Sequence, residues 1–255
     1  AAGLWAVRAY YETAFALSDL VALLERRIDR PEEILDAMRL EAVEDRNWVA
    51  VSLEGLAPVR AGRFFVHGRH DRSARPVNGI SLELEAAVAF GTGHHETTKG
   101  CLVVLDELLK STRPQRVLDV GCGTGVLGIA ASRATHHRAV MCDIDPLAVT
   151  AARGNARVNR AAGLVSAIQA AGVSHRCIQE MAPYDLVFAN ILARPLIKLA
   201  PDFAGICRPG AALVLSGLYV EQERWVFSAY RNAGYFLNKR IRLGSWSTLW
   251  LMRAG

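Results

Sequence analysis

Hydrophobic and polar positions divide the chain into two regions of different regularity. From Ile80 to the C-terminus, short apolar runs typical of buried strands alternate with segments whose apolar residues recur at helical spacing. This alternation predicts an α/β fold with a doubly wound, mainly parallel sheet. Before Ile80, glycines, prolines and arginines interrupt the pattern, which indicates a different organisation there.

The regular region predicts a seven-stranded sheet. The expected strands are residues 116–120, 139–143, 165–169, 185–189, 212–216, 235–243 and 246–252. The expected helices are residues 98–110, 126–134, 146–158, 195–207 and 221–232. Asp145 and Pro146 suit the N-cap and first position of a helix. The last two strands form a hairpin, which adds one antiparallel strand.

The region before Ile80 predicts a small N-terminal domain and a connector. Residues 4–12 and 36–43 have strand patterns, and residues 16–27 have the pattern of an amphipathic helix. We therefore expect an α+β domain over residues 1–44, in a truncated or reduced form. Residues 45–79 read as a linker with a short strand at 64–67, and residues 80–255 as the catalytic domain.

Composition narrows the class of protein. No apolar run reaches the length of a membrane span, and no secretory pattern opens the chain. The five cysteines form no C-x-x-C pair, which argues against a disulfide framework or zinc site and favours a reducing cytoplasm. The net charge of +5 fits either an RNA-rich neighbourhood or simply a mildly basic enzyme.

The first chemical motif is the glycine turn Asp119-Val-Gly-Cys-Gly-Thr-Gly125, which follows an apolar run. A glycine turn between strand and helix lets the backbone approach a nucleoside cofactor. Gly123, Gly125 and Gly128 also fit the G-x-G-x-x-G expression of NAD sites. However, an acidic residue at position 119 is typical of methyltransferases that use S-adenosylmethionine. Asp143, at the end of the next strand, is expected to bond the ribose hydroxyls.

Two further segments carry candidate chemistry. Residues 89–98 read Ala-Phe-Gly-Thr-Gly-His-His-Glu-Thr-Thr and precede a helix. Two adjacent histidines with no third ligand at suitable spacing do not make a metal site, so the segment reads as a cap over a polar cofactor or as a plain capped loop. Asn190 ends a strand, where ligands bind in open sheets, and an asparagine there can accept a hydrogen bond from an amine.

These three segments together resemble the ribosomal protein L11 methyltransferase family, a group of class I methyltransferases with a Rossmann-like fold. The resemblance runs from residue 47 to the C-terminus, through residues 62–67, 89–98, 119–125, 143–146, 190–195 and 215–218. It implies S-adenosylmethionine as cofactor, with S-adenosylhomocysteine as product. It also implies methylation of lysine side chains and the N-terminal amine of L11, free or on the ribosome, with no membrane and no sequence-specific nucleic-acid partner.

The resemblance implies roles for particular residues. Thr98, Gly121, Asp143 and Asn190 are expected to contact the cofactor, with Asn190 beside the transferred methyl group as the catalytic residue. Asp119, Gly123, Phe90 and Thr97 complete the expected cofactor-binding set. No general base is required, although His95 is a candidate, and the N-terminal domain is expected to recognise the protein substrate.

Four other readings remain open. A related enzyme could methylate lysine in another protein, such as an electron-transfer flavoprotein subunit. An NAD-dependent oxidoreductase is disfavoured by Asp119, and a nucleobase methyltransferase by the Ile191-Leu192 that follows Asn190. A non-catalytic module on the ribosome is the fourth alternative.

Overall fold

The computed structural model describes residues 18–21, 58–84 and 95–255, and the chain divides into two compact units, Ala1–Arg46 and Asn47–Gly255. In the first unit, residues 18–21 form a helical turn, within the helix predicted for residues 16–27. The strands predicted at residues 4–12 and 36–43 lie outside the described residues. The division between the units lies close to the boundary predicted at residue 44.

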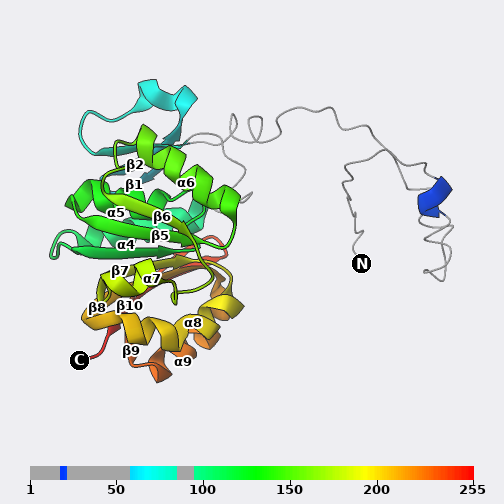
Figure 1. The fold of residues 1–255 in the computed structure, drawn as a ribbon, viewed down its shortest axis with the longest axis vertical. Helices are drawn as coiled ribbons and strands as arrows, with labels where there is room; N and C mark the ends of the chain where they lie inside the picture. Colours follow the sequence, from blue (N-terminus) through cyan, green and yellow to red (C-terminus); the bar gives the residue numbers. More distant parts are fainter. Residues whose placement is uncertain (1–17, 22–57, 85–94) are drawn as a thin grey trace. The chain divides into compact units, whose positions relative to one another are not determined.

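The second unit is built on a seven-stranded sheet with the order β6-β5-β4-β7-β8-β10-β9 (Figure 1). Its strands are β4 (Arg116–Val120), β5 (Arg138–Asp143), β6 (Val165–Gln169), β7 (Tyr184–Asn190), β8 (Cys207–Tyr219), β9 (Tyr235–Leu243) and β10 (Trp246–Arg253). Strands β4 to β8 are parallel, whereas β10 runs antiparallel to both β8 and β9. The predicted sheet and its single antiparallel strand are confirmed.

Helices cover both faces of this sheet. They are α4 (His95–Leu108), α5 (Val126–Thr135), α6 (Pro146–Val158), α7 (Arg176–Met181), α8 (Ala193–Ile206) and α9 (Glu223–Asn232), with a 3-10 turn η2 (Val220–Gln222) before α9. Side chains alternate between the faces, as the strand period requires. Val117 and Met141 pack with α4, α5 and α6, while Leu118 and Val140 pack with α7, α8 and α9. No helix in residues 18–21, 58–84 or 95–255 could cross a bilayer.

Residues 45–79 were predicted as a linker with a short strand at 64–67. That strand is confirmed as part of β2, but the other residues of this stretch that the structure describes do not form a linker. Residues 58–84 form β1 (Val59–Ala61), β2 (Phe64–Gly68), the 3-10 segment η1 (Arg69–Ala74) and β3 (Ile80–Leu84), in a three-stranded sheet. Its apolar side chains, including Phe64 and Leu82, belong to the same core as α4 and α5. The glycines and arginines that suggested a linker lie at turns and on the exposed side of this small sheet.

Polar contacts fasten the small sheet to the helices. The Arg63 guanidinium pairs with Asp106 of α4 at 2.6 Å. Asn159, at the end of α6, accepts a hydrogen bond from Glu83 N at 2.8 Å and donates one to Glu83 O at 2.6 Å. The small sheet therefore forms an outer layer of the second unit.

Candidate functional site

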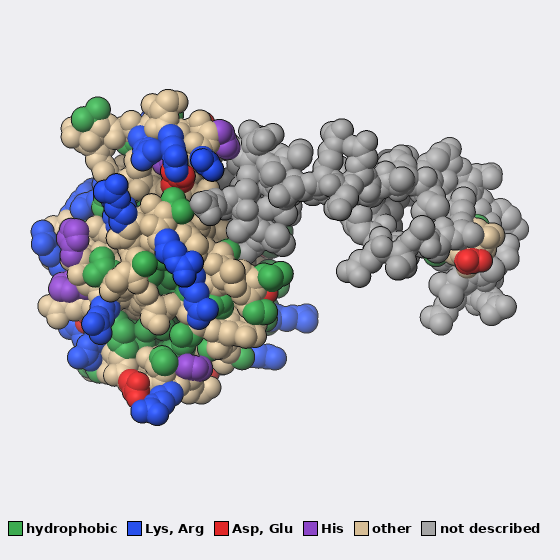
Figure 2. Space-filling model, turned by 45° about the horizontal axis from the view of Figure 1, so that its top comes forward, with side chains coloured by type: hydrophobic (Ala, Val, Ile, Leu, Met, Phe, Trp, Pro, Cys, Tyr) green, Lys and Arg blue, Asp and Glu red, His purple; other side chains and the backbone are tan. Residues whose placement is uncertain are grey.

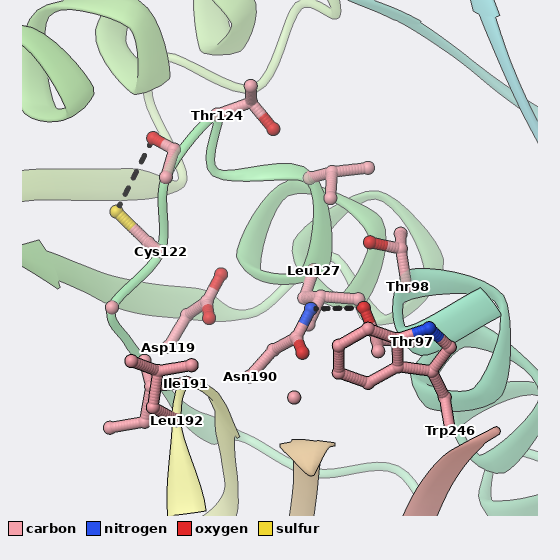
Figure 3. Close-up of a pocket in the computed structure, with 14 residues that line it drawn as sticks. Thr97, Thr98, Asp119, Cys122, Thr124, Leu127, Asn190, Ile191, Leu192 and Trp246 are labelled. Carbon is pink, nitrogen blue, oxygen red and sulfur yellow. Dashed lines mark hydrogen bonds between the residues drawn. The ribbon is translucent and has the colours of Figure 1, made fainter. Parts of the chain in front are cut away.

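A pocket lies at the carboxyl ends of the parallel strands, where open α/β sheets bind their ligands. It has a volume of about 250 Å³. Its walls come from the first turn of α4, the turn after β4, the ends of β7 and β8, and the beginning of β10 (Figure 3). Segments far apart in the sequence meet there because the parallel strands all end at this edge.

The turn between β4 and α5 forms one side of the pocket. Gly121, Gly123 and Gly125 have positive φ angles of 66°, 53° and 76°. A Cβ atom on Gly121 would also collide with the Cγ2 atom of Ile191. Both the backbone geometry and this close approach require glycine at position 121.

Asp119 lies beneath this turn, with 1% of its surface exposed. Its Oδ2 atom accepts a hydrogen bond from Gly128 N at 2.9 Å, whereas Oδ1 is buried without a partner among the described residues. The pKa of this carboxyl is raised to about 7, mainly by burial and to a smaller extent by the nearby Asp143, while the hydrogen bond from Gly128 opposes the rise. A buried carboxyl with an unused oxygen at a pocket wall fits a ligand that carries an amine.

Asp143 ends β5 and stands beside the glycine turn rather than in the pocket wall. Its Oδ2 atom accepts a hydrogen bond from Gly123 N at 2.9 Å, and its Oδ1 atom accepts one from Asp145 N at 3.1 Å. The predicted N-cap at Asp145 is confirmed, because its side chain accepts from Leu147 N. Asp143 therefore holds the turn itself, whereas Asp119 holds the first turn of α5 that follows it.

The far side of the pocket joins β7 to α4. The side-chain amide of Asn190 donates to Thr97 Oγ1 at 3.3 Å (Figure 3). Ser216, the register partner of Asn190 on β8, is fully buried, and its hydroxyl lies 3.5 Å from Thr97 O and 2.9 Å from Thr248 Oγ1. This network fixes the first turn of α4 over the sheet, and it leaves Asn190 Oδ1 with no donor among the described residues.

An aromatic side chain closes the pocket next to Asn190. Trp246 begins β10 and stacks on Tyr219 with 4.3 Å between ring centroids. In Figure 3 the indole lies close to Thr97 and Asn190. Ile191 and Leu192 also line the pocket, on the Asp119 side of Asn190 in Figure 3, and together with Trp246 they make up its apolar wall.

Most of the predicted site residues lie together. Thr97, Thr98, Asp119, Gly121, Gly123 and Asn190 line the pocket, and Asp143 is adjacent to it. Phe90 and the side chain of His95 lie outside the described residues. Nowhere in residues 58–84 and 95–255 do three potential metal-ligating side chains form a group.

Several lining residues were not predicted from the sequence, among them Ile191, Leu192, Gly217 and Trp246. Ile191, Leu192 and Gly217 fall within residues 190–195 and 215–218, which carried the resemblance. They could therefore have been predicted as lining residues. Trp246 gave no such signal, because its place follows from the pairing of β10 with β8.

The sequence of this chain is similar to those of known proteins from one family. Residues 3–254 match the family described as "Ribosomal protein L11 methyltransferase (PrmA)". A protein of Caulobacter sp. (strain K31) named ribosomal protein L11 methyltransferase is 46% identical over 251 residues, which cover 98% of this chain and 84% of that protein. A protein of the same name from Bradyrhizobium diazoefficiens is 48% identical over 223 residues, covering 88% and 76%.

A solved structure supports the fold. The crystal structure of a ribosomal protein L11 methylase from Lactobacillus delbrueckii subsp. bulgaricus superimposes with a TM-score of 0.67 at 24% identity. The match covers 78% of this chain and all of that one.

Proposed function

Because the chain belongs to the ribosomal protein L11 methyltransferase family, we propose that it transfers methyl groups from S-adenosylmethionine to amines of ribosomal protein L11. The observation that carries this proposal is one pocket that holds both a buried carboxyl, Asp119, and a strand-end amide, Asn190. The acceptors are lysine side chains and the N-terminal amine. L11 is the substrate, free or on the ribosome, and the N-terminal unit recognises it.

The residues around the glycine turn hold the cofactor. Asp119 accepts the ammonium group of the methionine moiety through its unused oxygen, and Gly121 contacts the cofactor through its backbone. Asp143 bonds the ribose hydroxyls, and Gly123, whose N–H bonds Asp143, sets the position of that carboxylate. Thr97 and Thr98 cover the cofactor from the α4 side, and Phe90 completes the cofactor-binding set.

Asn190 orients the acceptor amine. Its Nδ2 atom is occupied by Thr97, so the amide has a defined orientation and Oδ1 is available as an acceptor. An attacking amine that donates a hydrogen bond to Oδ1 has its lone pair directed at the methyl group. S-adenosylmethionine supplies that methyl group as an electrophile. Alignment of this kind provides a large part of the rate in bimolecular reactions.

The apolar wall prepares the amine for attack. A lysine with a pKa near 10.4 is neutral in fewer than about one molecule in a thousand at pH 7. Contact with Trp246, Ile191 and Leu192 removes water from the amine and lowers its pKa, because burial disfavours the charged form. A dedicated general base is therefore not needed, and the proton leaves to water.

Two assays test this proposal. S-adenosylmethionine should raise the melting temperature of the protein, whereas NAD should not, because only a ligand of the folded state stabilises it. Incubation with radiolabelled S-adenosylmethionine should label purified L11 and leave an electron-transfer flavoprotein subunit unlabelled. Labelling of the flavoprotein alone would assign the enzyme a different protein substrate, and stabilisation without any labelling would contradict the catalytic role.

A further inference from the structure

A second hollow lies at the opposite edge of the sheet, where β4, β5 and β6 begin. It has a volume of about 650 Å³ and is lined from the turns before these strands and from α7. Arg116, His137 and Arg138 contribute side chains to it. The pocket described above lies at the other ends of the same strands, so this hollow is not part of the proposed catalytic site.

Positive charge is concentrated at this edge. Arg116 and Arg138 are register partners on neighbouring parallel strands, and both are exposed. Arg113 lies in the turn before β4 and Arg160 in the turn before β6, and these two side chains are also exposed. Figure 2 shows Lys, Arg and His side chains together on the left side of the folded unit.

Acidic side chains at this edge do not neutralise these arginines. Glu180 pairs with Arg176, and Asp185 pairs with Arg208. The Arg116 guanidinium bonds the carbonyl oxygen of Ala182 and no carboxylate, although the backbone N–H of Arg116 donates to Asp185. Within residues 58–84 and 95–255, Arg113, Arg138 and Arg160 take part in no ion pair.

Helix dipoles account for only part of this arrangement. Basic residues at helix C-termini are favourable, and Arg160 follows the end of α6. Arg113 and Arg116, however, precede or begin β4, and Arg138 begins β5. Arg116 and Arg138 begin neighbouring strands, so both add positive charge to this edge, although the Arg116 guanidinium is directed to Ala182 on the side of β7. A phosphate group that accepts hydrogen bonds from either guanidinium would offset part of this charge.

We propose that this edge binds the phosphate backbone of RNA, without sequence preference. Arginine is suited to phosphate because its fork of N–H donors matches two phosphate oxygens. A membrane surface fits less well, since none of the exposed large apolar side chains of the described residues belongs to the turns before β4, β5 or β6. The choice of RNA among polyanions rests on the proposed function, because a ribosomal protein lies on RNA.

Fluorescence anisotropy with a short RNA duplex of mixed sequence tests the proposal on the full chain without cofactor or L11. We expect a Kd of about 10⁻⁶ to 10⁻⁴ M near physiological salt, with strong salt dependence. The triple variant Arg113→Gln, Arg138→Gln, Arg160→Gln should bind at least about tenfold more weakly, and the slope of log K against log salt should fall by about 2.

The matched control is the triple variant Lys198→Gln, Arg224→Gln, Arg231→Gln. It removes the same charge from exposed positions on α8 and α9 and should keep most of the affinity and slope. Equal losses in both variants, or equal binding of polyglutamate or anionic vesicles in place of RNA, would overturn the proposal. Both variants should methylate free L11 at the parent rate, so failure of RNA binding is distinguishable from failure of the proposed function.

Discussion

Asn190 at the end of β7 donates its side-chain amide to Thr97 in the first turn of α4, so the two segments that flank the pocket are joined directly. The buried Ser216 reinforces this junction from the neighbouring strand. The orientation of the Asn190 amide therefore depends on α4, a helix that comes before β4, β5 and β6 in the sequence.

Removing the Asn190 amide should reduce turnover far more than cofactor affinity. We expect Asn190→Ala to lower kcat for L11 methylation by about 100-fold, because the amine loses its alignment. Calorimetry should find the Kd for S-adenosylmethionine within a few-fold of the parent value. A parent rate of methylation would rule out the positioning role.

Thr97 provides the matched test of the hydrogen bond. Thr97→Ser keeps the hydroxyl that accepts from Asn190 and should retain most activity, whereas the isosteric Thr97→Val removes it and should lower kcat. Similar activity in the two variants would show that this hydrogen bond does not orient Asn190.

Loss of the Asp143 carboxylate should weaken cofactor binding. Asp143→Ala removes the proposed acceptor for the ribose hydroxyls, and we expect about a 10- to 100-fold rise in the Kd for S-adenosylmethionine by calorimetry. Asp145→Ala is the control, two residues away. It removes the N-cap of α6 and should cost about 1 kcal/mol of stability with little effect on Kd. An unchanged Kd in Asp143→Ala would exclude the ribose contact.

Asp119 should make cofactor affinity depend on pH. The ammonium group of the cofactor binds the ionised form of the Asp119 carboxyl, whose pKa is about 7. The affinity for S-adenosylmethionine should therefore rise about tenfold per pH unit from pH 5 to 7. It should fall again above about pH 8 as the cofactor amine loses its proton. Calorimetry across this range should give a bell-shaped curve for the parent. Asp119→Asn should bind weakly, without the acidic limb.

The stability of the cofactor-free protein should decrease as the pH rises and Asp119 ionises, whereas the cofactor affinity increases. The folded-state pKa of Asp119 is raised, so its contribution to stability is fully present below about pH 4 and is lost as the pH rises through about 7. The parent minus Asp119→Asn difference in melting temperature should therefore decrease from pH 4 to pH 8. A difference that stays constant would show that Asp119 is ionised throughout.

Gly121 should tolerate no side chain. Gly121→Ala places a Cβ atom against Ile191 at a positive φ angle, and we expect a loss of about 2 kcal/mol or more in the free energy of unfolding. Gly154→Ala is the control, because that helical glycine has open space around it and alanine there should stabilise the protein by up to about 1 kcal/mol. Chemical denaturation measures both, and equal stability of the two variants would contradict the steric argument.

Local sequence patterns predicted the strands and helices of the α/β domain wherever the local pattern matches the burial of the element in the fold. Strands such as residues 116–120 are buried on both faces and appear as apolar runs, and the helix at residues 146–158 has both its cap and its Pro146 in place. Residues 58–79 were predicted as a linker because glycines and arginines interrupt their apolar pattern. In the structure, Phe64 and Leu82 pack in one core with α4 and α5, and a local pattern does not show such a long-range contact.

Site residues could be predicted from the sequence where they end a strand. They could not be predicted where the pairing of distant strands brings them to the pocket. Asp119, Asp143 and Asn190 all follow apolar runs, so strand topology alone brings them to one edge. Trp246 reaches the pocket only because β10 inserts between β8 and β9. The short helix α7 gave no periodic signal over its six residues.

Mass spectrometry of L11 after incubation with this protein and S-adenosylmethionine is the most direct test of its function. The parent protein should add whole methyl groups to lysine side chains and the N-terminal amine, and Asn190→Ala should add far fewer in the same time. L11 that gains no methyl group, with a protein that still binds S-adenosylmethionine, would contradict the proposed activity.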